Sequence, residues 1–416
     1  MTKAARRTFH SLRYRNYRLF FGGQIVSQTG SWMQRIALSW FIWELTHSPF
    51  DVGVMAFAQF FPYMAFGLFA GVLADRLDAR RTVLGTQTAQ LVSASALAWI
   101  ALAGVAQPWM LYLIAFLNGT VLILDVPSRQ QLTYRMVGRE DLPNAIALNS
   151  TLFNASRIFG PAAAGVVLFA GAGVCFLFNA VSFLAVLIGL LAMRVSEFFP
   201  LEEFERPKIL AGTREGLVWL RSQPRMIVLL ALVFVFSTFC FNFNVTLPIL
   251  AAKTLHSNHL LFGVLSSVFG AGALVGALTA ASLARASTKV LLIGGAVFAA
   301  GELLLAPLHS AVLAGTLLFF VGAGFTAWSA NSNASMQLAA PDHLRGRVIG
   351  LYFYAFNGTG ALAGLMTGWL CSAGGTELAF AVSGIVGLVA IVATALALGW
   401  TPHIVSRRRA HAPQHA

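Results

Sequence analysis

The sequence predicts an all-α integral membrane protein, with twelve transmembrane helices arranged in two six-helix halves. Only 10% of its 416 residues are charged and 57% are hydrophobic, whereas about 25% of the residues of an ordinary soluble domain are charged. So little charge cannot cover a water-facing surface of this size, and most of the outer surface is therefore expected to face lipid. Twelve spans of ~20 residues would use roughly 240 residues, which leaves too few for a large extramembrane domain.

The apolar runs are continuous, which excludes the ten-residue alternation of an outer-membrane barrel. Since lipid cannot satisfy an open backbone, each run is expected to be a helix. The first run follows a basic start, but it is too long for a signal peptide and lacks a small-residue cleavage site, so we expect it to be retained. Charges and turn residues delimit the predicted spans, which are Leu19–Trp43, Phe50–Ala74, Val83–Val105, Trp109–Gln131, Ala145–Ala170, Val174–Met193, Met226–Ala252, Leu260–Leu283, Val290–Leu308, Ala311–Ala334, Val348–Leu370 and Leu378–Trp400.

Lysine and arginine residues gather on one side of these spans. Nearly all of the 28 lie in the two tails and in the even-numbered connections. By the positive-inside rule, both termini are expected in the cytoplasm, as in a multi-pass protein of the inner membrane of a bacterial cell. This distribution accounts for the net charge of +13 without nucleic acid as a partner. Basic connections also suit the anionic inner leaflet of a lipid bilayer.

The longest polar stretch, Arg194–Arg225, divides the chain into two halves. We expect an N-terminal six-helix bundle with a cytoplasmic tail over residues 1–193, a cytoplasmic linker over 194–225, and a C-terminal six-helix bundle with a basic tail over 226–416. The halves resemble each other, because Asn154 precedes Gly165 by the same interval that separates Asn357 from Gly368. Such a repeat is typical of transporters that rock about a site at the membrane midplane.

Several classes of function find no support in the sequence. The three cysteines, Cys175, Cys240 and Cys371, are far apart inside apolar runs, which implies no disulfide framework. The nine histidines lie in tails, loops or span ends, so we expect no metal site, no cofactor and no catalytic residues of an enzyme. The phosphate-binding pattern G-x-x-x-x-G-K-[ST] does not occur, so ATP-driven transport by this chain alone is unsupported.

The strongest local motif follows the second predicted span. Residues 71–81 read Gly-Val-Leu-Ala-Asp-Arg-Leu-Asp-Ala-Arg-Arg and resemble the signature of the major facilitator superfamily, G-x-L-a-D-r-x-G-r-k-x. The resemblance implies a cytoplasmic gate, in which an acid at the end of span two contacts span eleven. The alternative is ordinary positive-inside charge. The sequence departs from the signature at Asp78 and Ala79, and the predicted gate residues are Gly71, Asp75, Arg76, Arg80 and Arg81.

Further stretches are similar to the branch that holds enterobactin-type siderophore exporters and macrolide-efflux proteins, which are drug:proton antiporters. They are Asn16–Phe20, Leu45–Ser48, Pro127–Arg129 and Gly160–Gly165. The resemblance implies proton-coupled efflux of a small amphipathic molecule, a siderophore or a drug, by alternating access, and we expect a monomer. An uptake carrier or a non-transporting membrane sensor of the same fold is the alternative. Span four lacks the arginine of many drug/proton antiporters, so that residue's role cannot be carried over.

Charged residues inside predicted spans are costly and are therefore functional candidates. Counting ~1.5 Å per residue from the span ends places Arg157 and Glu302 near the midplane and Arg35 near the outer interface. Arg157 is expected to attract an anionic substrate group, and a buried structural arginine is the alternative. Arg35 is expected to snorkel or to pair with Asp51. Asp125 is expected near the inner end, in a charge network with Arg129 rather than on a proton path.

Weaker candidates come from polar, aromatic and small residues in the spans. Most such residues pack helices together, so packing is the alternative role for each. The polar and aromatic candidates for the substrate or coupling pathway are Gln28, Gln34, Asn118, Asn154, Asn242, Asn244, Trp328 and Asn331. The candidates for close helix packing are Gly160, Pro161, Gly165, Gly360, Gly364 and Gly368, because small residues let helices in lipid approach each other.

Overall fold

The computed structural model describes residues 9–200, 218–282, 286–341 and 344–399, without the side chains of residues 69–72, 74, 75, 345 and 346. Throughout these ranges the chain forms helices and turns and no strand. Eight of the helices in this part of the chain are long and apolar enough to cross a membrane. The prediction of an all-α membrane protein is therefore confirmed, and the number of twelve spans stays a prediction.

The first part of the chain forms long helices joined by short turns. They are η1 His10–Arg13, α2 Arg15–Thr46, α3 Pro49–Arg76, α4 Ala79–Leu102, α5 Pro108–Val167, the 3-10 turn η2 Leu168–Ala170, α6 Ala172–Leu191 and η3 Val195–Glu197. Helix α5 covers two predicted spans, and it kinks between them at Gly138, where φ is 72° and ψ is 179°. Only glycine adopts such a conformation readily. Asp78 caps α4 by accepting a hydrogen bond from the backbone N–H of Arg81.

The second part of the chain contains more interruptions. Its elements are α8 Pro224–Val235, the π-helical turn η4 Phe236–Cys240, α9 Phe243–Ile249, a second π-helical turn η5 Leu250–Thr254, α10 His259–Ser282, α11 Thr288–Leu305, α12 Ala311–Ala339, α13 Arg345–Asn357 and α14 Gly360–Ala397. The seventh predicted span is therefore broken near Asn242, between η4 and α9. Helix α14 bends at Gly374 and Gly375.

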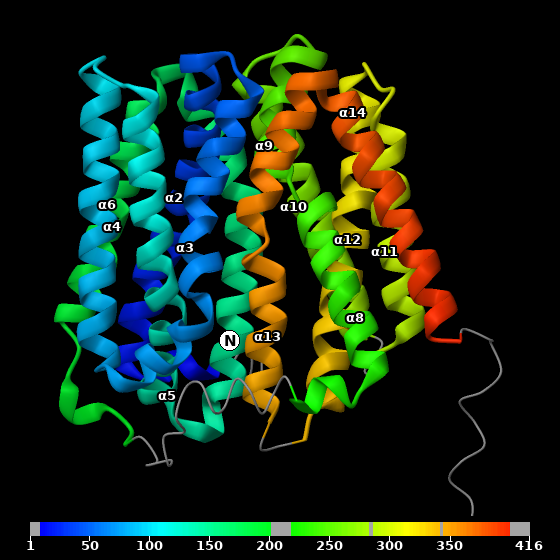
Figure 1. Ribbon diagram of the computed structural model, residues 1–416. Coiled ribbons are helices and arrows are strands. Elements are labelled where there is room, and N and C mark those ends of the chain that lie inside the picture. The colour runs from blue at the N-terminus through cyan, green and yellow to red at the C-terminus, as the bar shows by residue number, and fades with distance from the viewer. Residues whose placement is uncertain (1–8, 201–217, 283–285, 342–343, 400–416) are drawn as a thin grey trace, which may run out of the picture.

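The helices stand in two groups, as Figure 1 shows. We call α2–α6 the N-group and α8–α14 the C-group. Within the N-group α2 packs on α5 and α6, and within the C-group α12 packs on α10 and α11. The groups meet where α3 contacts α13 and α14 and where α5 contacts α10. The predicted domain boundaries stay predictions, and residues 201–217 of the predicted linker lie outside the described residues.

We name the two ends of the molecule by their residues. The basic end carries the α3–α4 turn at residues 77–78 and the residues 194–197, and the opposite end carries the turns at residues 47–48 and 256–258. At the opposite end, α3 and α14 touch backbone to backbone. A Cβ atom on Gly53 would lie 2.5 Å from the carbonyl oxygen of Gly364, and one on Gly368 would lie 2.9 Å from the Cα of Gly53. Only glycine fits such an approach.

A second close contact joins α5 to α10. A Cβ atom on Gly263 would lie 2.8 Å from the Cα of Gly165 and 2.6 Å from the carbonyl oxygen of Pro161. Gly160 instead contacts Trp32 within the N-group, and Gly360 contacts the Phe60 ring across the groups. The six residues predicted for close packing therefore all lie in described helices, and their effect on function stays a prediction.

Candidate functional site

Two arginines of the N-group lie around one indole ring. The guanidinium carbon (Cζ) of Arg35, on α2, is 4.6 Å from the centroid of Trp32, and that of Arg157, on α5, is 6.0 Å from the same centroid. Arg35 lies 11 residues before the end of α2, and Arg157 lies 10 residues before the end of α5. At ~1.5 Å per residue, both therefore lie at about the same depth below the opposite end.

This placement corrects the expectation that Arg35 lies near the outer interface. Helix α2 continues to Thr46, beyond the predicted end of the span, so more helix covers Arg35 than the sequence suggested. Asp51 does not reach Arg35 either. Its carboxylate accepts a hydrogen bond of 2.6 Å from the hydroxyl of Tyr112.

Aromatic rings of the C-group complete the surroundings of Arg157. Its Cζ atom is 4.9 Å from the centroid of Phe269, on α10, and 5.3 Å from that of Phe325, on α12. The Arg157 carbonyl oxygen also faces Gly270, where a Cβ atom would lie only 2.8 Å away. Arg157 therefore lies at the contact between the two groups. Contacts of a guanidinium with aromatic faces are favourable, more so where water is excluded.

Neither arginine has an anionic partner among the described residues. None of the ion pairs and hydrogen bonds found there involves the guanidinium of Arg35 or of Arg157. The charge of Arg35 instead acts on Arg157, so the two like charges repel each other. Two cations inside membrane helices without an acid nearby are unusual and costly. They leave several N–H donors available to a ligand.

A small cavity lies between α3 of the N-group and the C-group segments η4, α9, α13 and α14. It holds about 30 Å³, which is roughly the volume of one water molecule. Phe241 joins it to the arginine site, because this ring stacks on Phe325 with centroids 4.4 Å apart. The residues that line the cavity are Ala56, Phe60, Ser237, Phe241, Asn242, Asn244, Val245, Phe356, Asn357 and Gly360.

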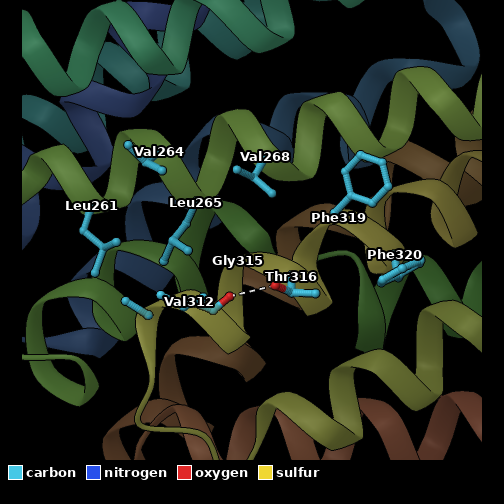
Figure 2. A pocket seen from close by; sticks show the side chains of 10 residues that line it. Leu261, Val264, Leu265, Val268, Val312, Gly315, Thr316, Phe319 and Phe320 are labelled. Carbon is cyan, nitrogen blue, oxygen red and sulfur yellow. Dashed lines mark hydrogen bonds between the residues drawn. The ribbon is translucent and has the colours of Figure 1, made fainter.

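A larger cavity, of about 590 Å³, lies between α10 and α12 and is shown in Figure 2. Its lining is apolar and includes Leu261, Val268 and Phe319. The hydroxyl of Thr316, the one polar side chain in that lining, donates a hydrogen bond of 2.9 Å to the carbonyl oxygen of Val312. No predicted site residue lines this cavity, and it offers no polar group that could orient a substrate.

Two buried acids lie away from the arginines, and they differ in their partners. Asp125 is 0% exposed and forms an ion pair with Arg129, the contact that the sequence predicted. The same carboxylate accepts hydrogen bonds from Thr86 at 2.6 Å and Gln87 at 3.0 Å. Arg129 in turn donates to Gln24. This network therefore links α2, α4 and α5 near the basic end.

Glu302, on α11, is 2% exposed and has no ion pair with a described residue. Its Oε2 atom has no hydrogen-bond partner. The carboxyl instead lies against the thiol of Cys240, in the π-helical turn η4. The Cys240 sulfur also lies 3.4 Å from the carbonyl oxygen of Ser383, on α14. Glu302 therefore contacts the interrupted helix of the C-group.

The predicted gate motif is described only in part, because the surroundings of Gly71 and the side chain of Asp75 are outside what the structure describes. Arg76 and Arg81 are exposed. Arg80 donates from Nε and Nη2 to the carbonyl oxygen of Leu190, at 3.1 and 2.9 Å, and so ties α4 to α6. The contact of this motif with span eleven stays a prediction.

Asp78, where the sequence departs from the family signature, has a structural role at the basic end. Besides capping α4, it forms an ion pair of 3.1 Å with Arg135 on α5. Burial alone would raise the pKa of Asp78, but the hydrogen bonds from the Arg81 backbone and from Arg135 outweigh it and hold the pKa below its ordinary value. The Asp78 carboxylate therefore caps the start of α4 and ties it to α5.

The remaining predicted residues fall into two sets, those without and those with a described hydrogen bond or close packing of the side chain. Gln28 and Asn118 are half-buried without a described hydrogen bond, and Asn244 faces the small cavity. The others use their polar atoms locally or are fully packed. Among these, Asn154 donates to Ser150, Gln34 accepts from Asn179, Asn242 donates to Thr238, Asn331 donates to Ala327, and Trp328 is 0% exposed and stacks on Phe236.

The aromatic partners of the arginines are not among the residues predicted from the sequence. Trp32 precedes Arg35 by three residues and follows Gln28 by four, a spacing that places all three on one face of a helix. That spacing is the sequence signal that places the Trp32 indole beside Arg35. For Phe269 and Phe325 there is no such signal, because the sequences of their own helices do not show which residues of α5 they contact. Among the described residues, no three His, Cys, Asp or Glu side chains gather as a metal site.

Long apolar helices in two packed groups, with charged side chains at mid-depth, are features of a membrane transporter of the major facilitator type. A model of the transmembrane secretion effector family matches residues 6–414. The chain belongs to this family of the major facilitator superfamily. The predicted family and fold are therefore confirmed.

Individual relatives agree with this assignment. The chain is 24% identical to the staphyloferrin A transporter of Staphylococcus aureus (strain NCTC 8325 / PS 47), over 80% of this chain and 84% of that one. It is 22% identical to macrolide efflux protein A of Streptococcus pyogenes, over 70% and 73%. The solved nucleoside transporter NupG is 14% identical and superposes with a TM-score of 0.73, over 94% of this chain and all of that one. The protein is thus a multi-pass membrane transporter of small molecules.

Proposed function

We propose that this protein exports a small amphipathic molecule, a siderophore or a drug, from a bacterial cell by proton-coupled alternating access. The relatives that transport staphyloferrin A and macrolides support this class of substrate. The single observation that carries the proposal is the position of Arg157, a charged residue at the contact between the two groups of helices. In transporters of this architecture, substrate sites lie near the midplane between the two halves.

Contacts between the groups support alternating access. At the opposite end, Trp40 of α2 stacks on Phe262 of α10 with ring centroids 6.1 Å apart. His259 packs against Phe169 at 4.5 Å and hydrogen-bonds the carbonyl oxygen of Gly165 at 3.1 Å. These contacts close the opposite end. We infer that transport requires them to open while the groups approach each other at the basic end.

The location that we propose is the inner membrane of a bacterial cell, with both termini in the cytoplasm and the chain acting as a monomer. Positive charge at the basic end supports this orientation. Arg15, Arg80 and Arg194 all lie there and bond the chain around Leu190 to Glu197. The opposite end is then extracytoplasmic.

Proton coupling is assigned to Glu302. The proton affinity of a carboxyl group that is buried without a basic partner changes when the polarity of its surroundings changes. Its neighbour Cys240 belongs to the π-helical turn η4, and broken helices of this kind line the sites of many secondary transporters. A rearrangement of η4 would therefore change the polarity around Glu302 and link its proton to the movement of the C-group.

Flux measurements test this function. The purified protein is reconstituted in proteoliposomes, and movement of staphyloferrin A and of a macrolide is followed with and without an imposed pH gradient. We expect gradient-driven transport of at least one compound by the wild-type chain. The Glu302→Gln variant should keep gradient-independent exchange of that compound but lose its gradient-driven accumulation.

Glu377→Gln is the matched control, because Glu377 is exposed and pairs with His309 at 3.2 Å at the opposite end. It should transport like the wild type. Uptake in the direction opposite to the one proposed would favour an uptake carrier, and ligand binding without any flux would favour a sensor. Undiminished gradient-driven accumulation by Glu302→Gln would reject its assignment as the coupling residue.

A further inference from the structure

We propose that Arg35, Arg157 and Trp32 form a binding site for a carboxylate group of the transported molecule, so that the protein selects anionic substrates over cationic ones. The proposal deepens the proposed function and rests on it, because it concerns the substrate of the same site. A site that binds a cation would not be expected to contain two arginines without an acidic partner.

The geometry brings two donors to one place from two helices. Arg35 of α2 and Arg157 of α5 approach the same indole at 4.6 and 6.0 Å and lie at about the same depth. Each guanidinium is a planar fork of N–H donors that matches the two oxygens of a carboxylate. An anion beside Trp32 would therefore be within reach of two forks.

The two guanidinium charges favour binding of an anion because no acidic side chain among the described residues pairs with them. Structural arginines inside membrane proteins are normally paired with an acid or with backbone carbonyls. Here, within the described part of the chain, neither guanidinium has such a partner, and the two repel each other. A bound carboxylate would remove that repulsion. A cationic ligand would add a third positive charge to a site that already holds two.

Aromatic rings define what the rest of the ligand can be. Phe269 and Phe325 of the C-group lie 4.9 and 5.3 Å from the Arg157 guanidinium. They offer an apolar surface directly beside the charged one. The site therefore fits an amphipathic carboxylate, whose charged end lies between the arginines and whose carbon skeleton lies against the two rings. Because the rings belong to the other group, such a ligand would also contact both halves of the transporter.

The site is not sealed from its surroundings. Phe153, one helical turn from Arg157 and 5.6 Å from the Trp32 ring, is 45% exposed. Ile25, two turns before Trp32 on the same face of α2, is 47% exposed. Both lie toward the basic end. A ligand would therefore enter from that end, which is the cytoplasmic side in the proposed orientation and the side from which an exporter loads.

Ligand binding by the purified, full-length transporter tests the proposal. Citrate serves as the carboxylate probe and tetraphenylphosphonium as the cationic probe, each titrated at constant ionic strength and followed by calorimetry and by the unfolding temperature. The variants are Arg35→Gln and Arg157→Gln. Lys253→Gln is the matched control, since it removes the same charge from an exposed position at the opposite end.

We expect citrate to bind the wild type and to raise its unfolding temperature, with tetraphenylphosphonium binding at least tenfold more weakly. Each arginine variant should lose at least tenfold in citrate affinity, whereas Lys253→Gln should match the wild type. Without ligand, the unfolding temperature of each arginine variant should equal or exceed that of the wild type, because the substitution removes repulsion. A purely structural arginine would give the reverse, a lower unfolding temperature without ligand.

Three results would overturn the proposal. They are absence of citrate binding by the wild type, equal citrate affinity in the wild type and both arginine variants, and preferential binding of the cation. The flux experiment with Glu302→Gln does not depend on any of these results. Absence of citrate binding with intact transport would therefore reject the carboxylate site alone, and citrate binding without transport would reject the proposed function alone.

Discussion

At the scale of single residues, the carboxylate of Asp141 joins three side chains at the basic end. Its carboxylate accepts hydrogen bonds from His10 at 2.9 Å, Arg13 at 2.6 Å and Tyr14 at 2.8 Å. Burial alone would raise the pKa of Asp141, but the hydrogen bonds from Tyr14 and His10 and the charge of Arg13 outweigh it and hold the pKa below its ordinary value. Asp141 thus fastens η1 to α5.

Because of this lowered pKa, the stability of the protein is expected to fall as the pH falls. Because the folded-state pKa lies below the unfolded value of about 3.9, Asp141 contributes its full stabilisation above that pH and loses it as the pH falls through the folded-state pKa. Asp141→Asn should therefore lower the unfolding temperature at pH 7. The difference from the wild type should shrink below about pH 4, as differential scanning fluorimetry can measure. A constant difference across this range would contradict the assignment.

The sequence indicated which residues to examine but not what surrounds them. A charge inside an apolar run is visible in the sequence, so Arg35, Asp125, Arg157 and Glu302 could all be selected. Their partners depend on how helices cross, which no single run contains. Asp125 was paired correctly, because Arg129 lies one turn away on the same helix. The neighbours of Arg157 come from α2, α10 and α12, and they required the fold.

At the scale of elements, hydropathy located the helices but not their interruptions. Two helical segments of α5 meet at Gly138, where the backbone is not helical, because the connection between spans four and five is otherwise helical. The break of the seventh span near Asn242 lies in an apolar stretch, between η4 and α9. Hydropathy records transfer to lipid and carries no information on the backbone angles of an individual residue.

The Gly138 kink leads to a prediction for α5. Its backbone angles are accessible essentially to glycine alone, and an added Cβ atom would lie 2.9 Å from the Phe199 ring. Gly138→Ala should destabilise the protein by about 1–3 kcal/mol, measured as a lower unfolding temperature. Gly85→Ala is the control, because nothing lies within 4 Å of its added Cβ atom in α4. That substitution should be neutral or stabilising by up to ~1 kcal/mol.

At the scale of the whole molecule, the two groups are joined at the opposite end by aromatic rings and by close backbone contacts. If transport requires this end to open, a covalent link across it must stop transport. In a chain without its three native cysteines, Phe169→Cys with His259→Cys places two thiols across the contact between η2 and α10. A short bifunctional thiol reagent should abolish flux, and a reducible version should restore it after reduction.

A second cysteine pair at the same end is the control for this experiment. Thr254 and Thr376, whose hydroxyl oxygens are 2.6 Å apart, both belong to the C-group. Linking Thr254→Cys to Thr376→Cys should leave transport intact, because the link joins elements that move together. Equal transport after either link would mean that the groups do not separate at this end.

The contact of Gly53 with Gly364 and Gly368 restricts which substitutions this transporter tolerates. The atoms nearest to an added Cβ on Gly364 or Gly368 are backbone atoms and the Cβ atom of Ala56, so no change of rotamer can make room for a larger residue. A saturation mutagenesis library should therefore show intolerant codons at intervals of four along α14. Codons for Leu362, 49% exposed, and Trp369, 59% exposed, should accept almost any apolar replacement.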